Sequence, residues 1–336
     1  MELANNYLKK GYHHVLRNAG VRTYVNLRNV GVRTYIKLGA QEFSAENALV
    51  ITGSPRSGTT WLMDIVSAPS GFTSIVEPLH LAFREVKQLG FTWRNFIPPD
   101  EKRPDVREYF KAVFSGKIAN GVNTRDTPFL KIPKTKMWVI KFARANRLLP
   151  WLVENFNFKY KPVLIIRHPC EVVYSQMKHP QFPPIEHIPH YDVELVEKHF
   201  PKFQALLKNI HTEEEIRALT WGLDNFIPFH YWQPEKWSIL SYEELVLDSY
   251  TVLKRLYSEW GLEPPLDSLL QIKKKGREAR EWSQFDSKGK KKLGVYKEFF
   301  TKEQICSILD IAREIGFVEF SENIEPDYDK LCQKHW

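Results

Sequence analysis

Short apolar runs and longer segments with helical spacing alternate along this chain. The runs predict four buried strands, at Ala48–Thr52, Trp138–Phe142, Pro162–Ile166 and Trp237–Leu240. Helices are predicted over Thr59–Val66, Ala143–Asn155, a segment that starts at Cys170, Asp192–Lys208, Glu213–Trp232, Glu243–Trp260 and Thr301–Ile315. Strands that alternate with helices predict an α/β fold of three layers, with a central parallel sheet and helices on both faces. Ligands of such sheets bind at the carboxyl ends of the strands.

An 11-residue repeat stands before the first predicted strand. Gly20-Val-Arg-Thr-Tyr is followed by Gly31-Val-Arg-Thr-Tyr. Eleven residues are close to three helical turns, so equivalent positions share one face. That face carries the apolar residues Val21, Tyr24, Val25, Val32, Tyr35 and Ile36. Two interpretations stay open: a basic amphipathic helix on an anionic membrane surface, or a helix packed on the domain. Arg28 interrupts the apolar arc and favours the second.

Three sections of chain follow from these patterns. Residues 1–47 form a basic, amphipathic N-terminal segment, residues 48–320 a single domain, and residues 321–336 a C-terminal tail. Hydrophobic residues make up 43% and charged residues 26%, which is ordinary for a globular protein. The chain has no apolar run long enough for a transmembrane helix, no apolar signal segment, and three widely spaced cysteines. We therefore expect a cytoplasmic protein, with peripheral membrane attachment as the alternative.

Positive charge is concentrated in two places. The net charge is +8, and residues 1–40 and 273–292 each contribute +6, so the remainder carries about −4. A near-neutral body with two basic segments does not suit nucleic-acid binding. Each basic segment needs an anionic partner or a solvated face.

The loop after the first predicted strand suits a phosphate. Gly53 and Gly58 have the spacing of a phosphate-binding loop at a helix N-terminus. A Walker A loop has lysine after the second glycine, but this chain has Thr59 there and carries its cation inside the loop, as Arg56. The strand Pro162–Ile166 ends in Arg167 rather than in an acid that could hold Mg²⁺. The pattern predicts a P-loop-like fold that binds an anion without a metal.

Three motifs together resemble one family. Pro-Arg56-Ser-Gly-Thr-Thr-Trp-Leu resembles the 5′-phosphosulfate loop of sulfotransferases that use 3′-phosphoadenosine 5′-phosphosulfate (PAPS). Arg167 with Ser175 eight residues later is similar to the family's pair for the 3′-phosphate. The segment around Tyr242-Glu243 is similar to a third shared element. Arg56, where cytosolic members have lysine, resembles the carbohydrate and tyrosyl types more closely.

The resemblance implies a role for each matching residue. Arg56 would contact the leaving phosphate, and Trp61 would stack on adenine or, alternatively, pack in the core. The lysine-rich segment, residues 273–292, would cover the nucleotide, or else be a solvated loop. The implied residues for PAPS, and for its product adenosine 3′,5′-bisphosphate, are Pro55, Arg56, Ser57, Gly58, Thr59, Thr60, Trp61, Arg167, Ser175, Tyr242, Lys290, Lys291, Lys292, Leu293 and Gly294.

A base must take the proton of an acceptor hydroxyl during sulfonyl transfer. Carbohydrate and tyrosyl members carry glutamate about 20 residues after the loop cation, and Glu77 of Glu-Pro matches that position. His80 is the reserve. Lys141, near a strand end, is a candidate for stabilising sulfuryl oxygens or contacting the acceptor, with a surface salt bridge as the alternative.

The acceptor is not specified by the sequence. Residues 81–135 and 178–212 are irregular and rich in aromatic residues, which suit sugars, phenols, lipids or core packing alike. A carbohydrate or glycolipid hydroxyl is favoured, with an anionic membrane bound through residues 1–40 as a further partner. The alternatives are a P-loop kinase or NTPase, and a non-catalytic nucleotide- or membrane-binding protein that would lose function with residues 1–40 but not with Glu77→Gln.

Overall fold

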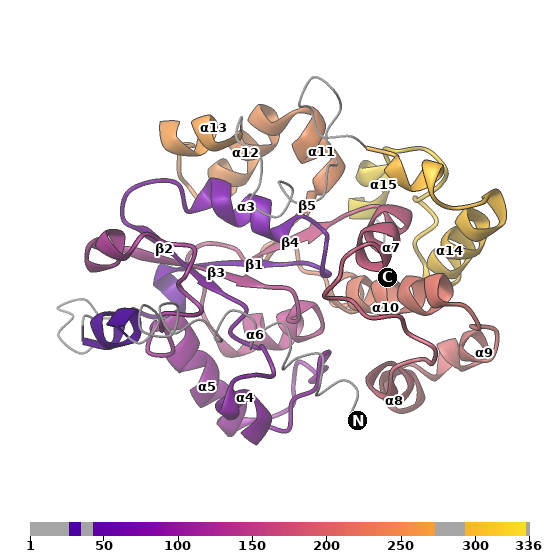
Figure 1. The fold of residues 1–336 in the computed structure, drawn as a ribbon, viewed down its shortest axis with the longest axis horizontal. Coiled ribbons are helices and arrows are strands. Elements are labelled where there is room, and N and C mark those ends of the chain that lie inside the picture. Colours follow the sequence, from indigo (N-terminus) through magenta and orange to yellow (C-terminus); the bar gives the residue numbers. More distant parts are fainter. Residues whose placement is uncertain (1–26, 35–42, 273–292, 334–336) are drawn as a thin grey trace.

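A parallel sheet of five strands, in the order β2-β3-β1-β4-β5, forms the centre of the molecule (Figure 1). The computed structural model describes residues 27–34, 43–272 and 293–333. The strands are β1 (Ala48–Thr52), β2 (Phe72–Val76), β3 (Met137–Phe142), β4 (Val163–Ile166) and β5 (Ser238–Ser241). Four strands agree with the prediction to within one residue at each end. The edge strand β2 was not predicted, because its apolar run is broken by Thr73 and Ser74.

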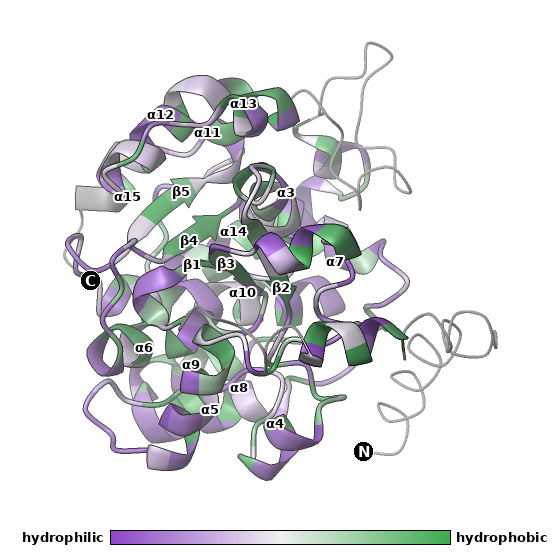
Figure 2. Cartoon of the chain, turned by 90° about the vertical axis from the view of Figure 1, so that its left-hand side faces the viewer, coloured by the Kyte–Doolittle hydropathy of each residue, from purple (hydrophilic) through white to green (hydrophobic). Residues whose placement is uncertain are grey.

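Helices cover both faces of the sheet, which confirms the predicted fold class (Figure 1). Leu49, Ile51 and Ile165 lie in a core cluster with α3 (Thr59–Val66), α11 (Tyr242–Leu247) and α12 (Ser249–Glu259). Val50 and Ile140 face the other side, toward α5 (Pro104–Phe114) and α6 (Leu149–Asn155). Alternate residues of one strand therefore serve two cores, as expected where both faces of a sheet are covered. Figure 2 shows the strands as mostly hydrophobic and the surrounding helices as mixed.

A third core cluster lies beside β4. It is built by α7 (Pro169–Met177), α10 (Glu213–His230) and α14 (Lys302–Ile315), around Leu164 and Ile166. Capping boxes at Thr212 and Thr301 begin α10 and α14. The remaining elements are η1 (Ala45–Asn47), α4 (Arg84–Gln88), η2 (Phe129–Lys134), η3 (Asn146–Leu148), α8 (His190–His199), η4 (Pro201–Phe203), α9 (Gln204–Leu207), α13 (Leu266–Ile272), η6 (Val295–Glu298) and α15 (Tyr328–Gln333).

Three predicted helices differ from the observed ones: one starts later along the chain, and two are each divided into shorter helices. The helix expected from Ala143 starts only at Leu149, with Pro150 in its first turn. The chain before it forms a bend at Ala143 and Arg144 and then η3. The helix expected over 192–208 is divided at Pro201. The helix expected over 243–260 is divided at Asp248, whose side chain caps α12.

The aromatic segment 81–135 is more regular than the sequence indicated. It contains α5, whose Phe110 and Phe114 are fully buried. These two rings pack in the hydrophobic core, so core packing rather than acceptor binding describes them. Trp93 and Phe96 remain only partly buried.

A short helix at residues 27–34 lies at the β2 edge of the sheet (Figure 1). Its Arg28 is 3% exposed and its Val32 is fully buried, so both point toward the domain. Arg28 therefore belongs to the inward face rather than interrupting an apolar one. The other apolar positions of the predicted repeat face lie outside the described residues. Within the described ranges, we find no helix with the length and apolar character needed to span a bilayer.

Candidate active site

Five chain segments meet at the carboxyl ends of the five strands. The loop after β1 carries Arg56, β2 is followed by Glu77, β3 by Arg144, β4 by Arg167 and β5 by Tyr242. This edge of a parallel sheet is where ligands bind, as predicted. The structure thus brings both predicted nucleotide motifs and the predicted base to one end of the sheet.

The loop after β1 has the backbone of an anion cradle. Arg56 and Gly58 have positive φ angles of 78° and 96°. A side chain at Gly58 would collide with the Tyr242 ring, since a Cβ atom there would lie 2.3 Å from Tyr242 Cδ2. Glycine is therefore required both by conformation and by space. The Ser57 hydroxyl is buried and has no hydrogen-bond partner among the described residues.

Arg56 joins the two predicted nucleotide motifs. Its Nε donates to Ser175 Oγ over 3.0 Å, and its carbonyl oxygen accepts from Arg167 Nη1 over 3.0 Å. The Gln176 side chain donates to the Pro55 carbonyl oxygen over 3.0 Å. The first loop and the start of α7 are consequently one hydrogen-bonded unit.

Arg167 is buried, with 3% exposure, and is held on several sides. Its Nη2 donates to the Glu171 carboxylate over 2.7 Å, and its guanidinium carbon lies 4.3 Å from the centre of the Tyr242 ring. Its Nε has no hydrogen-bond partner among the described residues. Burial lowers the pKa of Arg167, but its interactions with Tyr242, Glu171 and Glu243 outweigh burial and raise the pKa, so the side chain stays charged.

Glu171 ties Arg167 to the chain that follows the lysine-rich segment. The second oxygen of its carboxylate accepts from the backbone N–H groups of Gly294 and Val295, over 2.5 and 3.1 Å. Gly294 has a φ of 80°. Predicted residue Gly294 therefore lies at the site, and its neighbour Leu293 packs against the core cluster of α3, α11 and α12. Lys290, Lys291 and Lys292 fall outside the described residues.

Trp61 is 6% exposed and packs with the core cluster of α3 and α12. Its ring meets Tyr242 edge-on, with 6.0 Å between ring centroids. Of the two interpretations of Trp61, this arrangement fits packing in the core rather than stacking on adenine. Thr59 is also buried, whereas Thr60 is partly exposed.

Glu77 directly follows β2 and has a φ of 50°, an unusual conformation for glutamate. Its carboxylate accepts from Lys141 Nζ over 2.9 Å, from Arg144 Nη1 over 2.9 Å and from the Ala143 N–H over 3.0 Å. The strand register explains the first contact, because Lys141 of β3 pairs with Val76 of β2. Lys141 thus forms a buried ion pair with Glu77 rather than the surface salt bridge that was the alternative expectation.

Two cations compete for this one carboxylate. Burial opposes ionisation of Glu77, but the charges of Lys141 and Arg144 and the hydrogen bonds from Lys141 and Ala143 lower its pKa to about 2. Burial lowers the pKa of Arg144, and Glu77 only partly compensates. This part of the site carries one positive charge in excess, which suits an anionic group.

His80 lies one turn beyond Glu77. Its ring meets Trp93 edge-on, at 5.6 Å between centroids, and the Arg144 guanidinium carbon lies 4.3 Å from the centre of the Trp93 ring. Burial and the nearby Arg144 lower the pKa of His80 to about 4, so the ring is neutral at neutral pH. Glu77, His80, Trp93 and Arg144 thus form one connected cluster at the site.

A buried ionic network supports the site from α10. Arg147 pairs with Asp192 and Asp224 over 2.5 and 2.9 Å, and Arg94 pairs with Asp224 over 2.8 Å. Ser54 of the first loop hydrogen-bonds to Asp224 over 3.5 Å. Sequence reasoning missed these residues, and also Arg144 and Glu171. Only Glu171 offered a signal, since it stands inside the Arg167–Ser175 motif.

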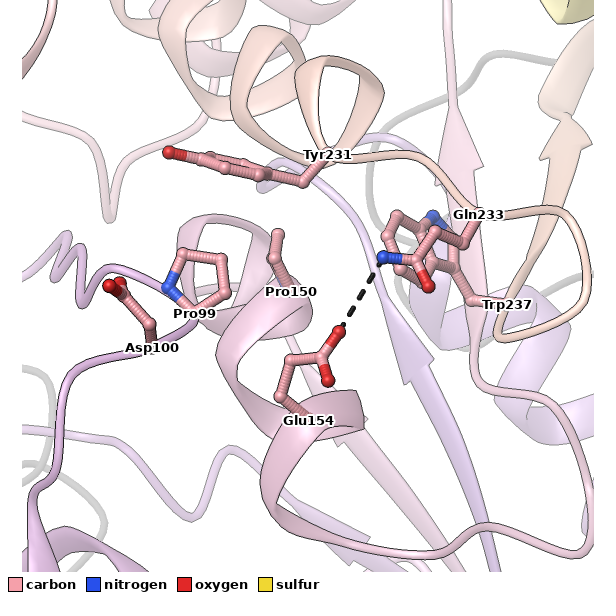
Figure 3. A pocket seen from close by; sticks show the side chains of 7 residues that line it. All are labelled: Pro99, Asp100, Pro150, Glu154, Tyr231, Gln233 and Trp237. Carbon is pink, nitrogen blue, oxygen red and sulfur yellow. Dashed lines mark hydrogen bonds between the residues drawn. The ribbon is translucent and has the colours of Figure 1, made fainter.

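A separate pocket of about 240 Å³ lies elsewhere (Figure 3). Its lining residues come from α6, the chain after α10 and a loop before α5, and are Pro99, Asp100, Pro150, Glu154, Tyr231, Gln233 and Trp237. Trp237 directly precedes β5, so the pocket is at the amino ends of the strands, opposite the site. Its lining has two acids and no lysine or arginine, which does not suit an anionic donor.

Comparison with protein families finds the sulfotransferase domain over residues 46–314. Among solved structures, the chain is similar to a sulfotransferase domain of the olefin synthase of Synechococcus PCC 7002, with 13% identity, coverage of 82% of this chain and 95% of that one, and a TM-score of 0.43. It is also similar to a sulfotransferase domain of the curacin biosynthetic pathway, with 15% identity, coverage of 82% and 99%, and a TM-score of 0.45. Mouse sulfotransferase SULT7A1 complexed with PAP shows 13% identity, coverage of 93% and 96%, and a TM-score of 0.43. No curated protein matches the chain.

Proposed function

Because the chain belongs to the sulfotransferase family, whose members take a sulfonyl group from PAPS and release adenosine 3′,5′-bisphosphate, we propose that it transfers this group to a hydroxyl of a carbohydrate or glycolipid. In this proposal Glu77 is the base, Arg56 stabilises the leaving phosphate and Lys141 stabilises the sulfuryl oxygens. The observation that carries the proposal is the junction of Arg56, Ser175 and Arg167 at the same sheet edge as Glu77.

The residues of the first loop and α7 fit an anionic donor. Ser57 Oγ and Arg167 Nε are buried polar atoms without partners among the described residues, and each can donate to a phosphate oxygen. We assign the 5′-phosphate to the loop Pro55–Thr60, and the 3′-phosphate to Arg167, Ser175 and Gly294. When bound, PAPS supplies a sulfonyl group on a phosphate leaving group. Arg56 would contact that phosphate and stabilise the negative charge that develops on it, which would lower the barrier.

The proposed base needs a change of partners before it can act. Glu77 already accepts from two cations and one backbone N–H, so its pKa of about 2 makes it a weak base. An anionic sulfonyl group gives Lys141 a second partner. If Lys141 turned toward it, Glu77 would lose one of its two cations, its pKa would rise, and a carboxylate oxygen could take the proton of the acceptor hydroxyl. Arg144 and the Ala143 N–H keep the carboxylate oriented meanwhile.

This arrangement predicts that donor binding precedes catalytic use of the acceptor.

His80 is the second candidate base. Its pKa of about 4 leaves it neutral and able to accept a proton, but Nδ1 already accepts from the Ala82 N–H over 3.0 Å. Glu77 is therefore preferred.

The first experiment is calorimetric titration of the protein with adenosine 3′,5′-bisphosphate in EDTA, beside ATP with Mg²⁺. Metal-independent bisphosphate binding that Arg167→Ala abolishes supports the donor site. Arg313→Ala is the matched control, since Arg313 is 52% exposed on α14 and pairs only locally with Asp310. Binding of ATP but not of the bisphosphate would overturn the proposal in favour of a kinase or NTPase.

The acceptor is tested next, with radiolabelled PAPS and panels of sugars, glycolipids and phenols. Label on a sugar hydroxyl, lost in Glu77→Gln, supports the proposed acceptor class. Label on phenols alone would contradict it without affecting the donor assignment.

A further inference from the structure

Four of the exposed large apolar side chains lie close together at the β2 edge of the sheet. Leu27, Val30, Phe129 and Leu130 are 68%, 65%, 40% and 82% exposed. The first two stand three residues apart on the helix of residues 27–34, and the other two begin η2. We call these four residues the edge patch. A solvent-facing apolar cluster of this kind usually marks an interaction surface.

The helix that carries half of the edge patch is firmly attached. Arg28 Nη2 donates to the carbonyl oxygens of Thr124 and Thr127 over 2.6 and 2.5 Å. Asn29 accepts from the Gly121 N–H over 2.6 Å. A Cβ atom at Gly31 would lie 2.4 Å from the Phe129 ring, so helix and η2 are in direct contact. The inward groups fix the helix, and Leu27 and Val30 are left on its outer side.

Basic residues surround the edge patch. Residues 27–34 and 125–136 contain six basic side chains and a single acid, Asp126. Arg28 is buried, whereas the other five, Arg33, Arg125, Lys131, Lys134 and Lys136, are exposed or partly exposed. Four further basic residues and one acid stand in residues 1–26 of the sequence. A second copy of the chain would bring like charges together, so the charge favours an anionic partner.

The edge patch adjoins residues 123–127, a segment that hydrogen-bonds to β2 just before the proposed base Glu77. The Val76 N–H donates to the Asn123 carbonyl oxygen over 2.8 Å, and the Ser74 N–H donates to Thr127 Oγ1 over 3.0 Å. Val76 directly precedes Glu77. Arg125 is close enough to His80 for its charge to lower the pKa of that ring. A surface that held the edge patch would therefore lie along the β2 edge, and Glu77 stands at the carboxyl end of that strand. We call the side of the site at Glu77 and His80 the acceptor side.

We propose that the edge patch docks the protein on an anionic lipid bilayer, with the four apolar side chains entering the interface and the basic residues contacting lipid headgroups. Docking would present the side of the site at Glu77 to an acceptor carried by a lipid. This orientation rests on the function proposed above, whereas the docking itself does not.

The test is cosedimentation with vesicles of phosphatidylcholine containing about one quarter phosphatidylserine, and with pure phosphatidylcholine, at low and high salt. The full chain should bind only the anionic vesicles, and less at high salt. Val30→Glu with Leu130→Glu should lower the partition coefficient at least about tenfold, since both the apolar and the electrostatic contributions are lost. The matched control, Leu247→Glu with Val318→Glu, changes two other exposed apolar residues, of 55% and 56% exposure, and should bind as the wild type does.

Three results would overturn the proposal: no binding to anionic vesicles, unchanged binding in the double variant, or a dimer that light scattering finds in the wild type and not in the double variant. The second would assign binding to residues outside the patch, and the third would assign the patch to self-association. Bisphosphate titration of the same preparations keeps the two proposals separate. Intact bisphosphate binding without vesicle binding removes only the docking surface, and it also shows that the double variant is folded.

Discussion

The two sides of the candidate site are held together in different ways. On the donor side, Arg56, Ser175 and Arg167 bond to one another and to backbone carbonyl groups, and Glu171 balances the charge of Arg167. On the acceptor side, Glu77 is shared by Lys141 and Arg144, and a positive charge is left over. The first arrangement joins side chains to one another and to one backbone carbonyl oxygen, with its charges balanced. The second has two cations for one carboxylate, and our proposal is that the donor draws one of them away.

The largest effect should come from Arg56, the loop cation of the donor side. Arg56→Ala should lower turnover by about three orders of magnitude, because in the proposed mechanism Arg56 would stabilise the charge that develops on the leaving phosphate. Single-turnover transfer of label from PAPS to the best acceptor of the screen measures this. Arg56→Lys is the matched control and should recover part of the rate. An equal loss in both variants would mean that the bond to Ser175, rather than the charge, is what matters.

Glu77→Gln should lower kcat by a factor on the order of 100 to 1000, with an unchanged Kd for adenosine 3′,5′-bisphosphate. Glutamine keeps the shape but cannot take a proton at neutral pH. The matched variant His80→Gln should have a small effect. If the two results were reversed, His80 would be the base and Glu77 an anchor for Lys141.

Lys141→Met tests whether the acceptor side exchanges partners. Removing Lys141 removes a positive charge and a hydrogen bond from Glu77, so the pKa of Glu77 should rise above its value of about 2 in the wild type. The carboxylate then becomes protonated at a higher pH, and kcat/KM should fall more steeply toward about pH 5 than in the wild type, besides an overall loss of about tenfold.

Lys236→Met, remote from the site and paired with Glu154, controls for loss of a lysine in an ion pair. Parallel pH profiles for the wild type and Lys141→Met would contradict the exchange of partners. They would leave Lys141 as a structural counter-ion.

The same division explains what the sequence could predict. The donor side depends on glycine spacing and on residues a few positions apart, such as Arg167 and Ser175. Its motifs can therefore be recognised in the sequence. The acceptor side depends on register: Lys141 reaches Glu77 because β3 lies beside β2, a strand that the alternation of residues did not indicate. The contact of Arg144 with Glu77 could not be predicted, since Arg144 lies in a segment whose residue spacing indicated a helix. Asp224 and Arg147 were likewise missed, because pairs 77 residues apart leave no local pattern.

The smallest expected effect concerns His168, which lies beside Arg167 on the donor side. Burial, with Arg167 and Lys297 nearby, lowers its pKa to about 4 from an ordinary 6.5, although its bond to the Ser321 carbonyl oxygen opposes this. The unfolded chain therefore binds a proton between about pH 6.5 and pH 4 that the folded chain does not, so stability falls as the pH falls through this range. Between about pH 7.5 and pH 5.5 the loss from this one group should be about 1 kcal/mol.

Urea unfolding of the wild type and His168→Gln at these two pH values measures the difference. Glutamine can keep the hydrogen bond to Ser321 but does not titrate, so the variant should lose less stability on acidification than the wild type does. His80 should contribute equally in both proteins and cancel. An identical pH dependence would mean that His168 becomes protonated without unfolding. The stacking of its ring on Tyr296, at 5.2 Å, would then be compatible with a charged imidazole, and the donor side would be less rigid than its hydrogen bonds indicate.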